Sequence, residues 1–114
     1  MTYDADVYSS PEKFGLRFVG SISDPDADYS FHLLCVWQET GGEGRLLWGE
    51  DSGCSCPSPF ENVGIDDLKE ATGGGWAAFF DAVGDFEVDT PSEYRGSLDA
   101  DKTELLAKVY RLAL

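Results

Sequence analysis

The sequence predicts a small α+β protein, in which a C-terminal helix and a shorter, aromatic-rich helix cover a three- to four-stranded antiparallel meander. Apolar residues alternate at period two between residues 14 and 50. A glycine-rich segment of hairpin length, 40–44, separates two of the alternating stretches. In the second half of the chain, apolar residues instead recur three and four residues apart, which is the spacing of one helix face. With 114 residues, we expect residues 1–114 to form a single domain.

The chain is expected to start with an arm or an edge over residues 1–13, which are mostly polar and contain Ser-Ser-Pro. A β-meander over 14–50 follows, and its first strand is expected over 14–22. By their spacing, the apolar residues of this strand share one face: Phe14, Leu16, Phe18 and Ile22.

The next stretch, 29–38, is expected to be the central strand of the sheet. In the middle of this strand, around Leu34 and Val36, the odd-numbered and the even-numbered residues are both apolar. A strand that is apolar on both sides is typical of one that is covered on both faces. We therefore expect other parts of the chain to pack on each side of it.

A hairpin is expected to join this strand to a third. The turn is 40–44, and the third strand covers 45–50, with Leu46 and Trp48 on one face. Trp37 and Trp48 are expected to be near neighbours across the hairpin, either packed in the core or exposed as an apolar patch.

Residues 65–114 are expected to be mainly helical. A short helical turn over 65–71 has acidic residues at its start, where the helix dipole favours them. A helix from Trp76 is expected to end at Gly84, and the clearest helix covers 97–114. Between them, a short strand around 86–88 remains open. The apolar residues with helical spacing are Trp76, Phe79, Phe80, Val83, Leu105, Leu106, Val109, Leu112 and Ala113.

A cysteine loop is expected over 51–64, because residues 50–61 read EDSGCSCPSPFE. Together with Trp37 and the Gly-Arg-Leu run at 44–46, this motif resembles a family of small acidic proteins encoded by actinobacteriophages and related prophages. The resemblance covers roughly residues 29 to 70. It implies a phage gene product that works in the cytoplasm of a bacterial host, and it carries no activity or binding residues with it.

The charge of the chain restricts its partners. There are 22 acidic residues against 8 basic ones, which gives a net charge of −14. Direct nucleic-acid binding is excluded, because each phosphate contact needs a cation. The sequence has no apolar stretch of the roughly 18 residues that a membrane span needs, so we expect a soluble protein without a membrane partner.

The leading hypothesis is a non-enzymatic protein that binds and modulates a host protein with a basic surface. A variant of it is an inhibitor that imitates nucleic acid, and the alternative is an acidic surface that only keeps the protein soluble. No catalytic residue is expected. The residues expected to contact a partner lie on the hairpin and the cysteine loop: Trp37, Trp48, Glu50, Asp51, Phe60 and Glu61.

A second hypothesis is a small metal-binding or thiol-redox protein centred on Cys54 and Cys56. Two thiolates two residues apart suit zinc, with Asp51, Cys35 or His32 completing the ligand set. Zinc sites usually have four ligands in two pairs, whereas this chain offers one pair, so no cofactor is expected. The competing interpretation is a rigid turn whose small side chains pack under the sheet.

Overall fold

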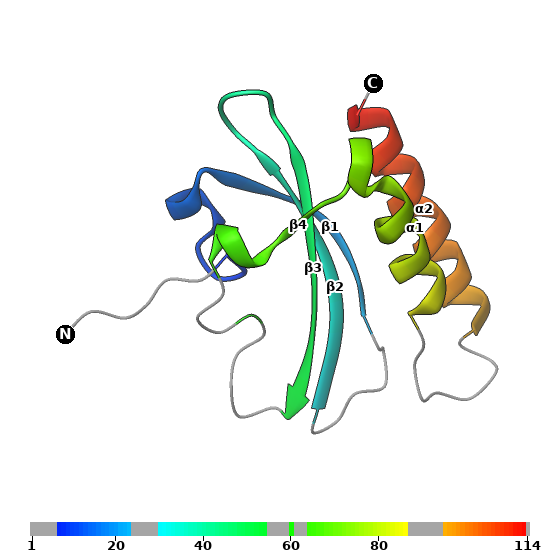
Figure 1. Cartoon of the computed structure of the whole chain (residues 1–114). Coiled ribbons are helices and arrows are strands. Elements are labelled where there is room, and N and C mark those ends of the chain that lie inside the picture. Colours follow the sequence, from blue (N-terminus) through cyan, green and yellow to red (C-terminus); the bar gives the residue numbers. More distant parts are fainter. Residues whose placement is uncertain (1–6, 24–29, 55–59, 61–63, 87–94, 114) are drawn as a thin grey trace.

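The computed structural model of the chain describes residues 7–23, 30–54, 60, 64–86 and 95–113, and the structural statements below concern these residues. They form an α+β fold, which confirms the predicted class (Figure 1). In chain order the elements are η1 (Pro11–Phe14), β1 (Leu16–Ser23), β2 (Ser30–Glu39), β3 (Leu46–Cys54), η2 (Ile65–Asp67), β4 (Lys69–Glu70), η3 (Gly73–Gly75), α1 (Trp76–Asp85) and α2 (Arg95–Ala113), where η denotes a 3-10 helix.

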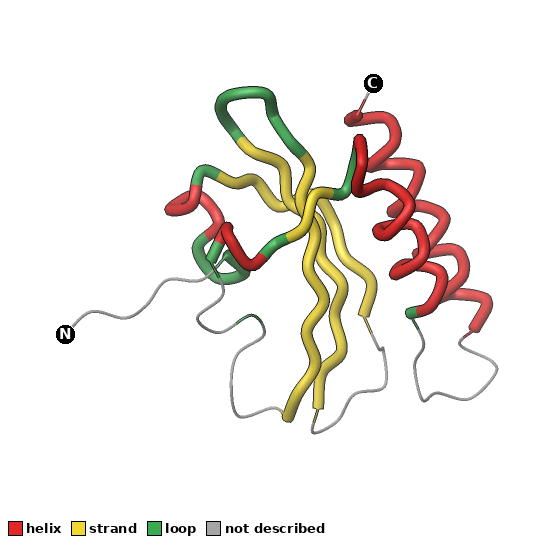
Figure 2. Tube along the Cα trace, viewed as in Figure 1, coloured by secondary structure: helices red, strands yellow, loops and turns green. Residues whose placement is uncertain are grey.

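The strands form one antiparallel sheet in the order β1-β2-β3-β4, which is the expected meander (Figure 2). The hairpin between β2 and β3 turns through Gly42 and Gly44, whose φ angles of 58° and 65° suit glycine best. β1 to β3 are long strands, whereas β4 has two residues and pairs only with Leu47 and Trp48. β2 is therefore a central strand with a long partner on each side.

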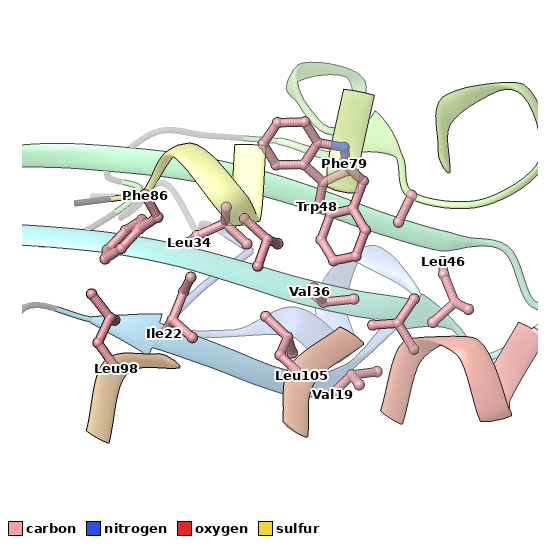
Figure 3. Close-up of a cluster of buried hydrophobic side chains, with 13 residues drawn as sticks. Val19, Ile22, Leu34, Val36, Leu46, Trp48, Phe79, Phe86, Leu98 and Leu105 are labelled. Atoms are coloured by element: carbon pink, nitrogen blue, oxygen red, sulfur yellow. The ribbon is translucent and has the colours of Figure 1, made fainter. Parts of the chain in front are cut away.

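Both faces of β2 are buried, which confirms the expectation from its sequence. Leu34 and Val36 point toward the helices and belong to a cluster that Figure 3 shows around Trp48 and Phe79. The opposite face carries a second, smaller cluster. Its buried members are Val7, Leu16, Cys35, Trp37, Leu47 and Phe60.

The helices α1 and α2 cover the first of these faces, side by side (Figure 1). α1 continues through Gly84, where the sequence predicts its end, to Asp85, and α2 already begins at Arg95. In the part of the chain that the structure describes, no helix is long and apolar enough to cross a membrane. The residues that the two helices bury in the core are Phe79, Val83, Leu98, Leu105 and Val109.

A β-bulge changes which residues of β1 share a face. The pairing of β1 with β2 shifts between Phe18 and Gly20. As a result, Leu16 and Ile22 lie in different clusters, on opposite faces of the sheet. The expectation that Leu16, Phe18 and Ile22 share one face is wrong, because the extra residue of a bulge reverses the alternation beyond it.

The tryptophans of the hairpin also differ from expectation. Trp37 pairs with Leu47, and Trp48 pairs with Val36, so the two indoles lie on opposite faces and are not neighbours. The turn sets this register, and a change of one residue in register would exchange the faces. Both rings are buried, with exposed fractions of 0% and 5%, so core packing describes them and an exposed tryptophan patch does not.

Two element boundaries near the cysteine motif differ from the predicted ones. β3 continues to Cys54, so residues 51–54 are strand and not the start of a loop. Residues 65–71 form the turn η2 and the strand β4 in place of one helical turn. The rest of the motif, except Phe60, and the open strand position at 87–88 lie outside the described residues.

The neighbours Phe79 and Phe80 provide a test of which face of α1 meets the sheet. Phe79 is fully buried, whereas Phe80 is 50% exposed. We expect Phe79→Ala to lower the free energy of unfolding by about 3–5 kcal/mol, because it leaves a cavity. Phe80→Ala is the matched control, with an expected change of less than about 1 kcal/mol. Urea denaturation of both variants measures the difference, and equal losses would contradict the packing of α1.

Candidate partner-binding groove

A groove follows the outer edge of β3, beside the point where β4 ends. β4 pairs with Leu47 and Trp48 only, so no other described strand continues along β3 beyond Trp48. The groove has a volume of about 390 Å³. We call it the edge groove, and its lining residues are Trp48, Gly49, Glu50, Asp51, Ser52, Phe60, Asp67, Leu68 and Lys69.

Main-chain groups of β3 face this groove. The Ala71 N–H donates to the Leu46 carbonyl at 2.7 Å, so the main chain of even-numbered residues in β3 points toward β4. By the same alternation, the peptide groups of Glu50 and Ser52 point outward beyond the end of β4. The Ser52 N–H donates to its neighbour, the Asp51 carboxylate, at 3.0 Å.

The side chains around the groove are mainly acidic. Glu50, Asp51 and Asp67 contribute carboxylates, and Lys69 contributes the one ammonium group of the lining. Lys69 lies over the Trp48 ring, with its nitrogen 5.1 Å from the ring centroid. This cation–π contact lets the ammonium group rest on an apolar surface. The lining of the groove therefore has more negative than positive charges.

His32 holds Glu50 from the helix side of the sheet. The His32 Nε2 lies 2.6 Å from a Glu50 carboxylate oxygen, and both side chains are partly exposed. The imidazole also stacks on Phe86, with 4.1 Å between ring centroids. The stacking and the hydrogen bond together fix the direction of the Glu50 side chain at the mouth of the groove.

Asp51 fixes the Phe60 wall of the groove through a hydrogen bond. Its carboxylate accepts a hydrogen bond from the Phe60 N–H at 2.8 Å, in addition to that from Ser52. Phe60 has a φ of 59°, a left-handed conformation that bulky residues rarely adopt and that costs about 1–3 kcal/mol. Its buried ring packs edge-on against the Trp37 ring, with 5.3 Å between centroids. It also stacks on the Tyr8 ring, with 5.9 Å between centroids. These contacts offset the strain.

The floor of the groove requires glycine at position 49. A Cβ atom at Gly49 would lie 3.0 Å from Leu68 and 3.1 Å from Phe60. Both distances are shorter than ordinary carbon contacts. The absence of a side chain therefore lets the two apolar walls approach the strand.

The structure brings four of the six expected partner-binding residues to this groove: Trp48, Glu50, Asp51 and Phe60. Trp37 lies behind it in the core, and Glu61 is outside the described residues. Trp48 and Phe60 are buried, so they form walls of the groove. Asp67, Leu68 and Lys69 are not among the residues expected here, because the predicted helical turn over 65–71 separates them from the sheet.

Of the residues of the metal hypothesis, the structure describes the side chains of His32, Cys35 and Asp51, and His32 lies apart from Cys35. Cys54 ends β3, but its side chain and Cys56 lie outside the described residues. His32 is on the opposite face of β2 from Cys35, so one ion cannot bind both side chains. Burial raises the pKa of the Cys35 thiol to about 12, and the charge of Asp51 adds to this rise. Among the described residues, no group of three or more His, Cys, Asp or Glu side chains could hold a metal ion.

Comparison with known proteins gives one match. A family model with the description "Domain of unknown function (DUF7574)" matches residues 5–100. No curated protein and no solved structure matches the chain. The matched range includes all the residues that line the edge groove.

The role of Asp51 can be tested through stability. We expect Asp51→Ala to lower the free energy of unfolding by about 1–3 kcal/mol, because two N–H groups lose their acceptor. Asp66→Ala, at an exposed carboxylate in η2, is the control, with an expected change within about 0.5 kcal/mol. Chemical denaturation measures both, and a similar loss in the two variants would show that Asp51 does not hold this wall.

The buried thiol predicts a dependence of stability on pH. Since the pKa of Cys35 rises on folding from an ordinary 9.0 to about 12, its contribution is constant below about pH 9. Above that pH the unfolded state loses the proton first, and stability falls by about 1.4 kcal/mol per pH unit. Wild type should therefore lose about 1.4 kcal/mol more than Cys35→Ala between pH 8 and 10. Identical pH dependences of the two proteins would refute the burial effect.

Proposed function

The chain belongs to the family described as Domain of unknown function (DUF7574), and we propose that it is a non-enzymatic binding protein. The edge groove holds a basic, extended segment of a partner protein. The observation that carries this proposal is a single groove that combines three carboxylates, one ammonium group and a strand edge along which no described strand continues.

The groove matches such a segment in two ways. The outward N–H and carbonyl of Glu50 and the outward carbonyl of Ser52 provide a donor and acceptors for an extended main chain, as in binding by strand addition. The carboxylates of Glu50 and Asp67 attract Lys or Arg side chains, while Leu68 offers an apolar contact. Charge complementarity of this kind mainly raises the association rate and excludes acidic competitors.

The resemblance described above supports a context for this binding. Residues 29–70 carry the resemblance to phage-encoded proteins, and they contain the whole groove. We therefore propose that the protein is phage-encoded and acts in the host cytoplasm, where its partner is a host protein. Host proteins that bind DNA or RNA are one class with suitable basic surfaces, and the groove would then imitate the charge of a nucleic acid.

A charge-neutral double variant tests the proposal. Glu50→Gln with Asp67→Asn removes two groove charges and keeps side-chain oxygens opposite the Gly64 N–H and the His32 Nε2. Tagged protein is used to capture partners from an actinobacterial host lysate at low and physiological salt. A captured partner is then titrated with each variant. We expect binding to weaken about 2- to 30-fold, since exposed ion pairs contribute about 0.2–1 kcal/mol each.

The matched control is Asp81→Asn with Asp85→Asn, which removes the same charge from an exposed part of α1. It should leave the affinity within about twofold of wild type. Equal weakening in both double variants would show that only the overall charge matters and would refute the groove. The absence of any salt-sensitive partner would refute the binding function.

A further inference from the structure

A second hollow, at the other edge of the sheet, has the opposite charge. It lies between β1 and the C-terminal half of α2 and has a volume of about 340 Å³. Three of the eight basic residues of the chain converge on it from these two elements. We call it the cationic hollow, and its lining residues are Arg17, Phe18, Val19, Lys108, Arg111 and Leu112.

The cations of this hollow are not neutralised within the described part of the chain. The ion pairs in those residues involve Arg45 and His32, although acidic side chains are abundant. Arg45 shows the contrast, because Glu39 binds its guanidinium group through two contacts, at 2.9 and 3.0 Å. Arg17, Lys108 and Arg111 form no such pair there.

Arg17 is nevertheless held in position. Its guanidinium group donates to the side-chain oxygen of Gln38, and the Gln38 amide nitrogen donates to the Gly44 carbonyl at 3.3 Å. Gln38 is neutral, so this chain of hydrogen bonds orients the guanidinium group and leaves its charge available. An oriented, uncompensated guanidinium group is well suited to bind a carboxylate or a phosphate.

Apolar side chains lie beside these charges. Phe18 is 44% exposed and Leu112 is 37% exposed, and both line the hollow. The Phe18 ring, however, packs edge-on against Trp37, with 6.1 Å between centroids, so it lies toward the face of the sheet opposite to α2 and only borders the hollow. Leu112 is therefore the exposed apolar side chain that lies on the same side as the cations of α2.

A purely structural account explains only part of this arrangement. Lys108 and Arg111 lie toward the C-terminal end of α2, where cations stabilise the helix dipole. That effect needs neither Arg17 on a neighbouring strand nor the exposed Leu112 side chain beside the charges. The convergence of two elements on one hollow points to a ligand.

We propose that the cationic hollow binds an anionic group, a carboxylate or a phosphate, that is carried on an apolar body. The anion meets Arg17, Arg111 and Lys108, and the apolar body covers Leu112. The source of this chemistry is either a small organic anion or an acidic side chain beside an aromatic one in a partner protein. The edge groove, on β3, is a separate site.

The test uses defined probes and the isotope-labelled full chain. Phenyl phosphate, inorganic phosphate and an acetylated, amidated Glu-Phe-Glu tripeptide are each titrated at physiological salt. NMR follows the backbone amides of β1 and α2 and the side-chain Nε–Hε groups of Arg17 and Arg111. We expect saturable shifts at the hollow, with at least tenfold tighter binding of phenyl phosphate or the tripeptide than of inorganic phosphate. Saturation by phenyl phosphate identifies a small anion, and saturation by the tripeptide alone identifies a protein segment.

Variants distinguish the hollow from general charge attraction. Arg17→Gln with Arg111→Gln should weaken binding of the effective probe at least tenfold. Arg45→Gln, which removes a cation already paired with Glu39, should change it less than twofold. The proposal is overturned if no probe shifts these signals, if inorganic phosphate binds as tightly as the other probes, or if the two sets of variants weaken binding equally.

Discussion

The burial of both faces of β2 is the constraint on which the rest of the structure depends. Leu34 and Val36 on one side and Cys35 and Trp37 on the other must all leave water, so the chain has to supply a cover for each face. Two helices cover one side. The N-terminal segment with Val7, the η2 region and Phe60 cover the other. The position of Phe60 beside β3, and with it one wall of the edge groove, follows from this second requirement.

The groove is thus a by-product of how the smaller cluster closes. Phe60 joins that cluster in a left-handed conformation. The Asp51 carboxylate stabilises this conformation by accepting a hydrogen bond from the Phe60 N–H. Gly49 leaves room for the ring and for Leu68. The residues that shape the groove are therefore mostly structural, whereas Glu50, Asp67 and Lys69 at its mouth determine its charge. The residues that shape the groove therefore differ from those that we propose to attract a partner.

Period-two and helical spacing predict the fold class, the central strand and both helices, because these patterns report burial over many residues. They fail where one residue changes the geometry. The bulge in β1 separates Leu16 from Ile22, and the register of the hairpin separates Trp37 from Trp48. Gly20 beside the bulge and the turn at 40–44 are local signals for these features, but the spacing of apolar residues does not include them. For the groove, the charged motif around Glu50 and Asp51 points to the right region, but the contribution of Asp67 and Lys69 depends on long-range pairing with β3.

The shortness of β4 has a consequence for the solubility of the protein. A strand edge without a neighbour is a template on which another copy of the chain can add, and proteins commonly protect such edges with charged side chains. Along β3, acidic residues occupy the positions next to the open peptide groups, and two copies placed edge to edge would bring like charges together. The carboxylates of Glu50 and Asp51 therefore disfavour edge-to-edge association of two copies through charge repulsion. Replacing these carboxylates with neutral residues would remove this repulsion and favour the pairing of two copies along β3.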